Sequence, residues 1–198
     1  MDDLYRKVNN SYLKSYKDPF LILIGGCSRS GKSSLSSELA VRFIANSIGT
    51  QIITLDSWIV PVDERPFKSL VTNRFDLNAA RQAVDLLLRK RIAEIPIYDP
   101  ILRGSSCKPN TQITIENKTI LIVEGVVALC DDSLLARSNL KIFVDVNDRL
   151  RIKRLIKFYR DIKKLRRDVY KNIIQEREDE EVIFIKKSAI RANLIFKN

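Results

Sequence analysis

Residues 26–33 read GCSRSGKS, and they lie between the apolar run FLILI at residues 20–24 and a segment with helical spacing. They match the pattern G-x-x-x-x-G-K-[ST], whose glycines let the backbone wrap phosphate groups while N–H groups and a helix N-terminus point at them. The context makes the match specific, because the pattern follows an expected buried strand and precedes an expected helix. This feature predicts a phosphate-binding loop, and a glycine-rich turn without a ligand is the alternative.

Each residue type in the loop has an expected task. Lys32 is expected to reach the outer phosphates of a bound triphosphate, and the hydroxyl of Ser33 to ligate Mg²⁺. Cys27 is expected to be an inert residue of the loop, since nothing else in the sequence suggests redox chemistry. The residues expected to hold the nucleotide are Gly26, Ser28, Ser30, Gly31, Lys32, Ser33 and Ser34.

Apolar runs and segments of helical spacing alternate along the rest of the chain. The expected strands span residues 20–24, 51–55, 119–123 and 140–146, with weaker ones at 111–115 and 193–196. The expected helices span residues 32–46 and 77–92, and a long loop is expected over residues 57–75. Strands that alternate with helices imply a three-layer α/β fold with a parallel sheet of about five strands. The length of 198 residues predicts a single domain over residues 1–198.

The charge balance indicates an anionic partner. The chain has 35 Lys and Arg against 24 Asp and Glu, a net charge of +11, and it has no histidine, which excludes histidine-based catalysis and histidine-ligated metals. Residues 151–172 alone hold ten basic residues and two Asp, so they contribute +8. Apolar residues keep helical spacing there, which predicts a basic amphipathic helix or a pair of helices.

Cysteine usage and the chain start bear on location. Cys27, Cys107 and Cys130 are scattered and odd in number, which favours a reducing cytoplasm over a disulfide framework. The first 18 residues lack the apolar stretch of a signal peptide, and no run reaches the roughly 18 apolar residues needed to span a bilayer. We therefore expect a cytoplasmic protein without a membrane partner.

Two carboxylates follow expected strands directly. Asp56 comes after residues 51–55 and Glu124 after residues 119–123. Because ligands of open parallel sheets bind outside the carboxyl ends of the strands, both are candidates for chemistry at the phosphate loop. Asp56 could accept the proton of an attacking hydroxyl and Glu124 could hold the metal or its water shell. The alternatives are a turn-capping role for Asp56 and an ion pair with a lysine for Glu124.

The motifs GGCSRSGKSS, LDSW, RFD, IPIYDP, IVEGVVAL and KIFVDV, in this order, resemble the uridine kinase and phosphoribulokinase group of P-loop kinases over residues 19–160. The resemblance implies that Asp56 is the catalytic base and a ribose ligand, that Asp76 binds ribose hydroxyls, and that Tyr98 contacts the base of the acceptor. It places Glu124 in the magnesium site. Asp76 is also a candidate helix N-cap, and Tyr98 a candidate for simple packing at the edge of the core.

The resemblance further implies a P-loop NTPase fold of the nucleoside-monophosphate-kinase-like type, with ATP and Mg²⁺ as cofactors and a basic helical lid at about residues 154–175. Arginines of such a lid close over the phosphates. The candidates are Arg154, Arg160, Arg166 and Arg167, with Arg160 proposed as catalytic.

The sequence departs from this family at the acceptor pocket. Trp58 and Ile59 stand where an aromatic pair is usual, and Trp58 is a candidate either for stacking on the acceptor or for loop packing. The histidine expected shortly after Tyr98 is missing, and Arg103 stands at about that position. An arginine there suggests a negatively charged acceptor, because its planar fork suits phosphate.

The leading hypothesis is an ATP- and Mg²⁺-dependent kinase that phosphorylates a hydroxyl of a nucleoside such as uridine or cytidine. The first alternative is the same chemistry on an anionic acceptor, a sugar phosphate or a nucleotide. A nucleic-acid-binding or regulatory P-loop NTPase is an alternative of another class, which the lack of a recognisable nucleic-acid module disfavours. The absence of Asn-Lys-x-Asp disfavours a signalling GTPase and leaves ATP as the expected donor. A homo-oligomer is compatible with the sequence.

Overall fold

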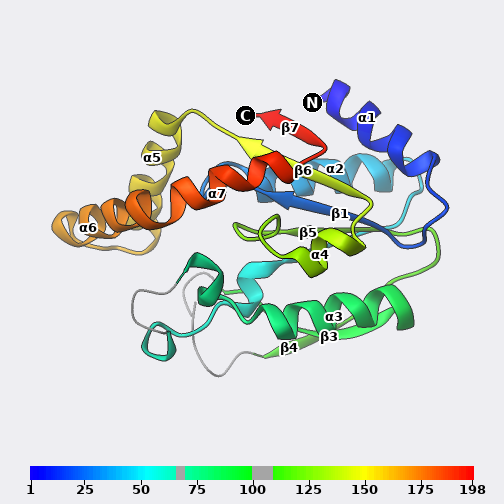
Figure 1. Cartoon of the computed structure of the whole chain (residues 1–198), viewed down its shortest axis with the longest axis horizontal. Helices are drawn as coiled ribbons and strands as arrows, with labels where there is room; N and C mark the ends of the chain where they lie inside the picture. Colours follow the sequence, from blue (N-terminus) through cyan, green and yellow to red (C-terminus); the bar gives the residue numbers. More distant parts are fainter. Residues whose placement is uncertain (66–69, 100–108) are drawn as a thin grey trace.

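The structure is a computed structural model that describes residues 1–65, 70–99 and 109–198 (Figure 1). Arg103 and Cys107, two residues of interest in the sequence, lie outside the described residues. None of the described helices is long and apolar enough to cross a membrane.

A five-stranded parallel sheet forms the centre of the molecule. Its strand order is β2-β5-β1-β6-β7. The strands are β1 (Phe20–Gly25), β2 (Thr50–Thr54), β5 (Ile120–Glu124), β6 (Leu140–Asp145) and β7 (Leu194–Lys197). The apolar runs therefore identified all five strands to within about one residue. The expected three-layer α/β fold with a parallel sheet is confirmed.

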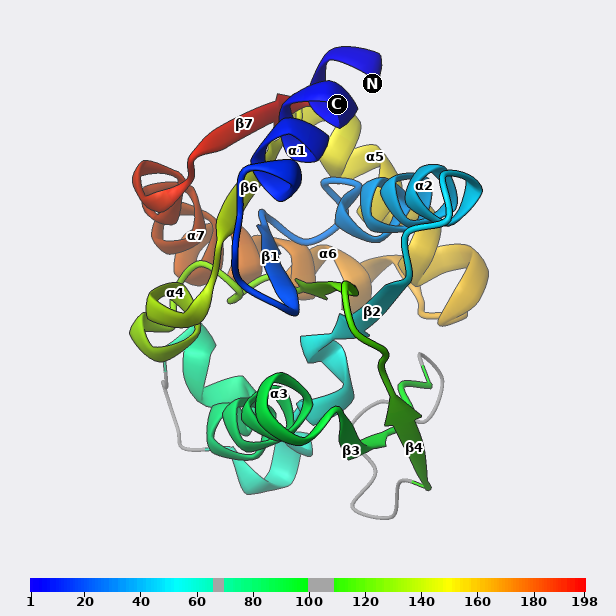
Figure 2. The same ribbon diagram turned by 90° about the vertical axis from the view of Figure 1, so that its right-hand side faces the viewer.

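Helices cover both faces of this sheet (Figure 2). Because successive strand residues point to opposite faces, Ile22 packs on one side, against α1 (Asp2–Leu13) and α2 (Lys32–Ala45). Leu23 packs on the other, against α3 (Leu77–Lys90), α4 (Asp132–Arg137) and α7 (Ile183–Lys187). Burial on both faces explains why β1 and β5 are continuous apolar runs instead of alternating ones.

Several elements differ from the sequence expectations. The helix expected over residues 77–92 ends at Lys90, because Arg91 adopts a left-handed conformation with φ 62°. The strand expected at residues 111–115 is β4 (Asn110–Thr114), which pairs antiparallel with β3 (Ile92–Pro96) in a separate two-stranded sheet. No pattern in the sequence predicted α1, since only Leu4 and Val8 of this polar segment are fully buried.

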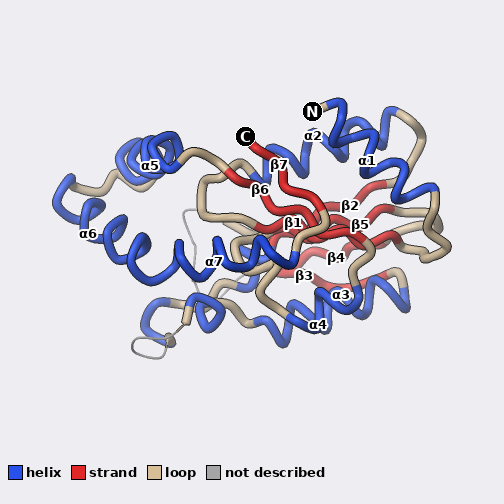
Figure 3. Tube along the Cα trace, turned by 45° about the horizontal axis from the view of Figure 1, so that its top comes forward, coloured by secondary structure: helices blue, strands red, loops and turns tan. Residues whose placement is uncertain are grey.

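The basic region forms two helices beyond the end of the sheet, α5 (Asp148–Lys157) and α6 (Arg167–Arg177) (Figure 3). Each continues into a π-helical segment, residues 158–162 after α5 and residues 178–182 after α6. A small apolar core joins the two helices. It consists of Leu155, Phe158, Tyr159, Tyr170 and Ile174. The apolar spacing noted in the sequence thus packs the pair of helices together and leaves most of their basic groups exposed.

Candidate functional site

The phosphate-binding loop connects the carboxyl end of β1 to the first residue of α2. Gly26 has φ 145°, and a Cβ atom at this position would lie 2.5 Å from the carbonyl oxygen of Val144. Gly31 has φ 105° and caps α2. Both positions therefore require glycine, and they turn the chain so that the N-terminus of α2 faces the loop, as anion binding needs.

Lys32 is buried at the start of α2, and its ammonium donates a hydrogen bond to the carbonyl oxygen of Cys27 at 3.0 Å. A buried charge needs such a partner, because transfer from water is costly without one. Here the partner belongs to the loop itself. A phosphate oxygen that entered the loop would offer the ammonium a charged acceptor in exchange.

Ser33 and Glu124 meet across the loop. The hydroxyl of Ser33 donates to Oε1 of Glu124 at 3.0 Å. Burial raises the pKa of Glu124, nearby Lys32 opposes this rise, and the charge of Asp56 adds to it. The described residues contain no cluster of three or more carboxylate, cysteine or histidine ligands. One carboxylate and one hydroxyl fit Mg²⁺, which is usually held by one or two carboxylates together with substrate phosphates.

The strand register brings Asp56 to the same place. Glu124 is paired with Ile24 of β1 on one side and with Thr54 of β2 on the other, so the three strands end at one level. Asp56 lies just beyond β2 in a short 3₁₀ turn, where the side chain of Thr54 accepts from its backbone N–H at 3.3 Å. The Asp56 carboxylate is half-buried and faces the cavity next to the loop.

That cavity has a volume of about 1400 Å³, and most of the residues selected from the sequence line it. Those that line it are Ser28, Gly31, Lys32, Ser33, Ser34, Asp56, Tyr98, Glu124 and Arg154. Gly26 and Ser30 are buried in the loop behind it, and Trp58 is buried in the core against the sheet. Burial favours the packing alternative for Trp58 over stacking on an acceptor.

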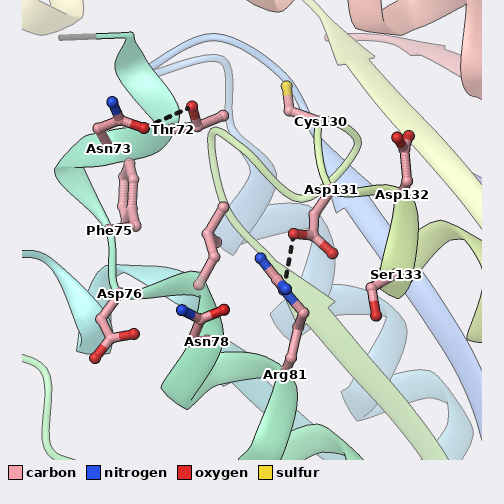
Figure 4. A pocket seen from close by; sticks show the side chains of 11 residues that line it. Thr72, Asn73, Phe75, Asp76, Asn78, Arg81, Cys130, Asp131, Asp132 and Ser133 are labelled. Atoms are coloured by element: carbon pink, nitrogen blue, oxygen red, sulfur yellow. Dashed lines mark hydrogen bonds and ion pairs between the residues drawn. The ribbon is translucent and has the colours of Figure 1, made fainter.

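Asp76 lies elsewhere. Its carboxylate accepts from the backbone N–H of Ala79 at 2.9 Å, so its N-cap function is confirmed. It lines a second, polar cavity of about 580 Å³ between α3 and α4 (Figure 4). In this cavity Nε of Arg81 is 3.0 Å from Oδ2 of Asp131. A ribose contact by Asp76 therefore stays a prediction, and the structure does not bring this residue to the large cavity.

Of the four arginines expected in a lid, the structure brings Arg154 to the loop. Its Nη1 donates to the carbonyl oxygens of Arg29 and Ser30, at 3.4 Å each. Arg160 and Arg166 are 63% and 84% exposed and pair with nearby aspartates of their own segments. Together with Arg167 they lie outside the residues that line the cavity. A catalytic role for Arg160 stays a prediction that would require the lid to move.

Several arginines in the cavity were missed from the sequence. Cζ of Arg29, inside the phosphate loop, lies 3.7 Å from the ring centroid of Phe158, in the π-helical segment after α5. Arg65, Arg74 and Arg177 also line the cavity. Arg74 belongs to the RFD motif, but the motif itself predicted no role for it. Arg29 and Arg74 contact residues far away in the chain, Phe158 and Glu181, and no local sequence pattern reports such contacts.

We expect Cys27 to resist alkylation when the protein is folded. Burial raises the pKa of its thiol to about 11 from an ordinary value of 9.0, while Arg151 and Lys32 oppose the shift. Below pH 9 the reactive thiolate is therefore about a hundredfold scarcer than for an ordinary thiol. Iodoacetamide labelling at pH 8, followed by peptide mass spectrometry, should be slow and should accelerate as the pH rises. Equal labelling rates in folded and urea-unfolded protein would contradict this.

Comparison with known proteins places the chain in a family. The family described as Phosphoribulokinase / Uridine kinase family matches residues 21–198. The uridine kinase of Bacillus pumilus is 33% identical over 157 residues, which cover 76% of this chain and 71% of that protein. The uridine kinase of Streptococcus mutans is 34% identical over 148 residues, 71% of this chain and 68% of that one. The match to the uridine kinase of Saccharomyces cerevisiae, 27% identical, covers 28% of its length.

Solved structures agree on the fold. A candidate fructose transport system kinase from Silicibacter sp. TM1040 superposes with a TM-score of 0.78 at 18% identity, covering 98% of this chain and 97% of that one. The D-glycerate 3-kinase of Cryptococcus neoformans superposes with a TM-score of 0.57 at 12% identity, covering 86% and 85%. These structural similarities establish the P-loop kinase fold, and the sequence matches identify the family within that fold. The chain belongs to the phosphoribulokinase and uridine kinase family.

Proposed function

We propose that this protein transfers the γ-phosphate of ATP to a hydroxyl group of a nucleoside such as uridine or cytidine. The observation that carries the proposal is the convergence of Lys32, Ser33, Glu124 and Asp56 on one cavity, from three strands that end at the same level. The names of the bacterial relatives, which are about one-third identical, support the choice of acceptor.

The proposed mechanism assigns one task to each group. The loop backbone and Lys32 hold the outer phosphates in line with the acceptor hydroxyl, because positioning supplies much of the catalysis of phosphoryl transfer. The carboxylate of Asp56 accepts the proton of the attacking hydroxyl. Arg154, already bonded to the loop, neutralises charge that develops on the transferred group. Ser33 and Glu124 would hold Mg²⁺, which supplies charge neutralisation on the phosphate oxygens when bound.

The bonding of Arg74 bears on the choice between an uncharged and an anionic acceptor. Arg74 lines the cavity, but its guanidinium is already bonded to the carboxylates of Glu180 and Glu181. Its charge is therefore compensated by the protein itself. An anionic acceptor would have to displace one of these carboxylates to use this arginine, whereas a nucleoside would not. As far as Arg74 is concerned, this pairing supports the nucleoside over a sugar phosphate or a nucleotide.

The proposal is tested by a coupled assay of ADP release with ATP and Mg²⁺. The acceptor panel contains uridine, cytidine, their monophosphates and several sugar phosphates. We expect kcat/KM for uridine or cytidine to exceed that for the phosphorylated acceptors by tenfold or more, about 1.4 kcal/mol of discrimination. Turnover with a phosphorylated acceptor only would replace the nucleoside by the anionic alternative. ATP binding without turnover on any acceptor would contradict the proposal, and salt-dependent oligonucleotide binding would then be measured.

A further inference from the structure

The π-helical segment 178–182 connects the lid to the segment beside Asp56. We propose that Arg74 and Glu181 form a positioning pair, which sets the Asp56 carboxylate and the acceptor side of the cavity without contacting the reacting atoms. The inference rests on the proposed function, in that it assigns these residues to acceptor binding at the same site. Neither residue was selected for this role by the sequence.

The contacts of the pair are specific. Nη1 of Arg74 lies 3.1 Å from Oε2 of Glu181, and Nη2 lies 2.8 Å from Oε2 of Glu180. The side chains of Arg74 and Glu181 are only 17% and 6% exposed, whereas that of Glu180 is 54% exposed. A buried carboxylate that loses its cation is strongly destabilised, so the guanidinium and Glu181 fix each other's position. Glu180 contributes little by comparison, because exposed pairs are screened by solvent.

Arg74 is connected to Asp56 through the backbone. Its carbonyl oxygen accepts from the N–H of Val60 at 2.9 Å, and the N–H of Asp76 donates to the carbonyl oxygen of Trp58 at 2.8 Å. These bonds flank an isolated β-bridge between Ile59 and Phe75. The N–H of Ile59 in turn donates to the carbonyl oxygen of Asp56 at 3.3 Å. Two backbone hydrogen bonds, made by the adjacent residues Val60 and Ile59, therefore link Arg74 to Asp56, and we expect a displacement of Arg74 to reach Asp56 by this route.

Glu181 is held on the opposite side by the lid. The same π-helical segment contributes Glu178, which pairs with the buried Arg151 of α5. Arg151 precedes by one helical turn Arg154, the residue that donates to the phosphate loop. π-helical segments occur frequently at functional sites, and this one uses two of its acidic residues to join α5 to the acceptor side. The pair thus gives the acceptor side a fixed position relative to the phosphate loop.

An arginine suits this task better than a lysine would. Its planar fork presents two N–H groups in different directions, one for each carboxylate, while an ammonium is a single point charge on a flexible stem. Arg74→Lys should therefore retain the charge but lose much of the positioning. Glu181→Gln removes the charge with little change of shape and leaves Arg74 with the exposed Glu180 alone.

A control variant separates positioning from general loss of stability. Asp85 of α3 forms a half-buried ion pair with Arg137 of α4, and neither residue lines the large cavity. Asp85→Asn therefore removes a comparable ion pair away from the site. Both Glu181→Gln and Asp85→Asn are expected to lower the melting temperature, so melting alone does not decide the question.

When the wild type turns over an acceptor, its kinetics distinguish a positioning role of Glu181 from a general loss of stability. We expect Glu181→Gln to lower kcat/KM for the acceptor by about ten- to a hundredfold, the range that a small misplacement of a catalytic group causes. KM for ATP should stay near the wild-type value, Arg74→Lys should be impaired in the same way, and Asp85→Asn should keep acceptor kinetics close to wild type. Unchanged acceptor kinetics in Glu181→Gln, or an equal loss of ATP and acceptor affinity, would overturn the inference.

Trp58 provides a readout that needs no turnover. It is the single tryptophan of the chain, it is buried, and its carbonyl oxygen accepts one of the two bonds that flank the β-bridge. We expect acrylamide to quench its fluorescence more strongly in Glu181→Gln than in wild type or Asp85→Asn. Equal quenching in all three proteins would overturn the positioning pair. If the wild type phosphorylates no acceptor while the quenching differs as expected, the proposed function fails and the positioning pair stands.

Discussion

Asp56→Asn is expected to lower kcat by about 10²- to 10⁴-fold, the usual contribution of a general base. The amide keeps the shape of the side chain but cannot accept the hydroxyl proton of the acceptor. Asp56 lies beyond β2, whereas the phosphates of ATP are assigned to the loop and Lys32. The variant should therefore still bind ATP with nearly wild-type affinity. Steady-state kinetics together with titration of a fluorescent ATP analogue measure the two effects separately.

The control for this variant is Asp63→Asn. Asp63 is an exposed acidic residue of the same long loop, outside the set that lines the cavity. Its loss changes the net charge equally, and we expect nearly unchanged kcat. If Asp56→Asn retained more than about a tenth of wild-type kcat, Asp56 would not be the general base.

Lys32→Met is expected to lower kcat/KM by about 10²- to 10³-fold, the range seen when an enzyme loses one preorganised hydrogen-bond donor to developing charge. The buried ammonium is the group of the phosphate loop that can follow the outer phosphates. Methionine fills similar space without a charge, so the fold should persist. Its melting temperature should stay near the wild-type value, because the change removes a desolvated charge from a buried position.

Lys153→Met is the matched comparison for Lys32→Met. Lys153 is an exposed lysine of α5 outside the residues that line the cavity. Its removal should leave kcat/KM close to wild type. Nearly normal turnover in Lys32→Met, or an equal loss in both variants, would show that net charge and not the phosphate loop governs catalysis.

The sheet was predictable because its strands are buried on both faces. Apolar runs such as residues 20–24 and 119–123 are shorter than a typical buried helix, so they indicate buried strands. The hairpin of β3 and β4 was only half anticipated, since its first strand follows a helix end that depends on the left-handed Arg91. Helix α1 could not be predicted from the sequence, because its burial comes from packing against α2 and the sheet and not from a strong apolar pattern.

The residues of the candidate site were also predictable only in part. The phosphate loop could be found because its residues are adjacent in sequence, and Asp56 and Glu124 because parallel strands end together. Arg74 and Arg177 could not be found in this way. Arg74 is held by Glu181, more than a hundred residues away in the chain, and Arg177 packs against the ring of Tyr159. Asp76 illustrates the converse, because the sequence offered two roles and the structure shows the N-cap.

The most direct measurement is identification of the phosphorylated product. The protein is incubated with ATP labelled in the γ-phosphate, Mg²⁺ and uridine or cytidine, and the products are separated and analysed by mass spectrometry, with Asp56→Asn in parallel. We expect label in a nucleoside monophosphate, in equal amount to the ADP formed, and nearly none with the variant. Label that stays in ATP or appears only as inorganic phosphate, with the nucleoside unchanged, would contradict the proposed kinase activity.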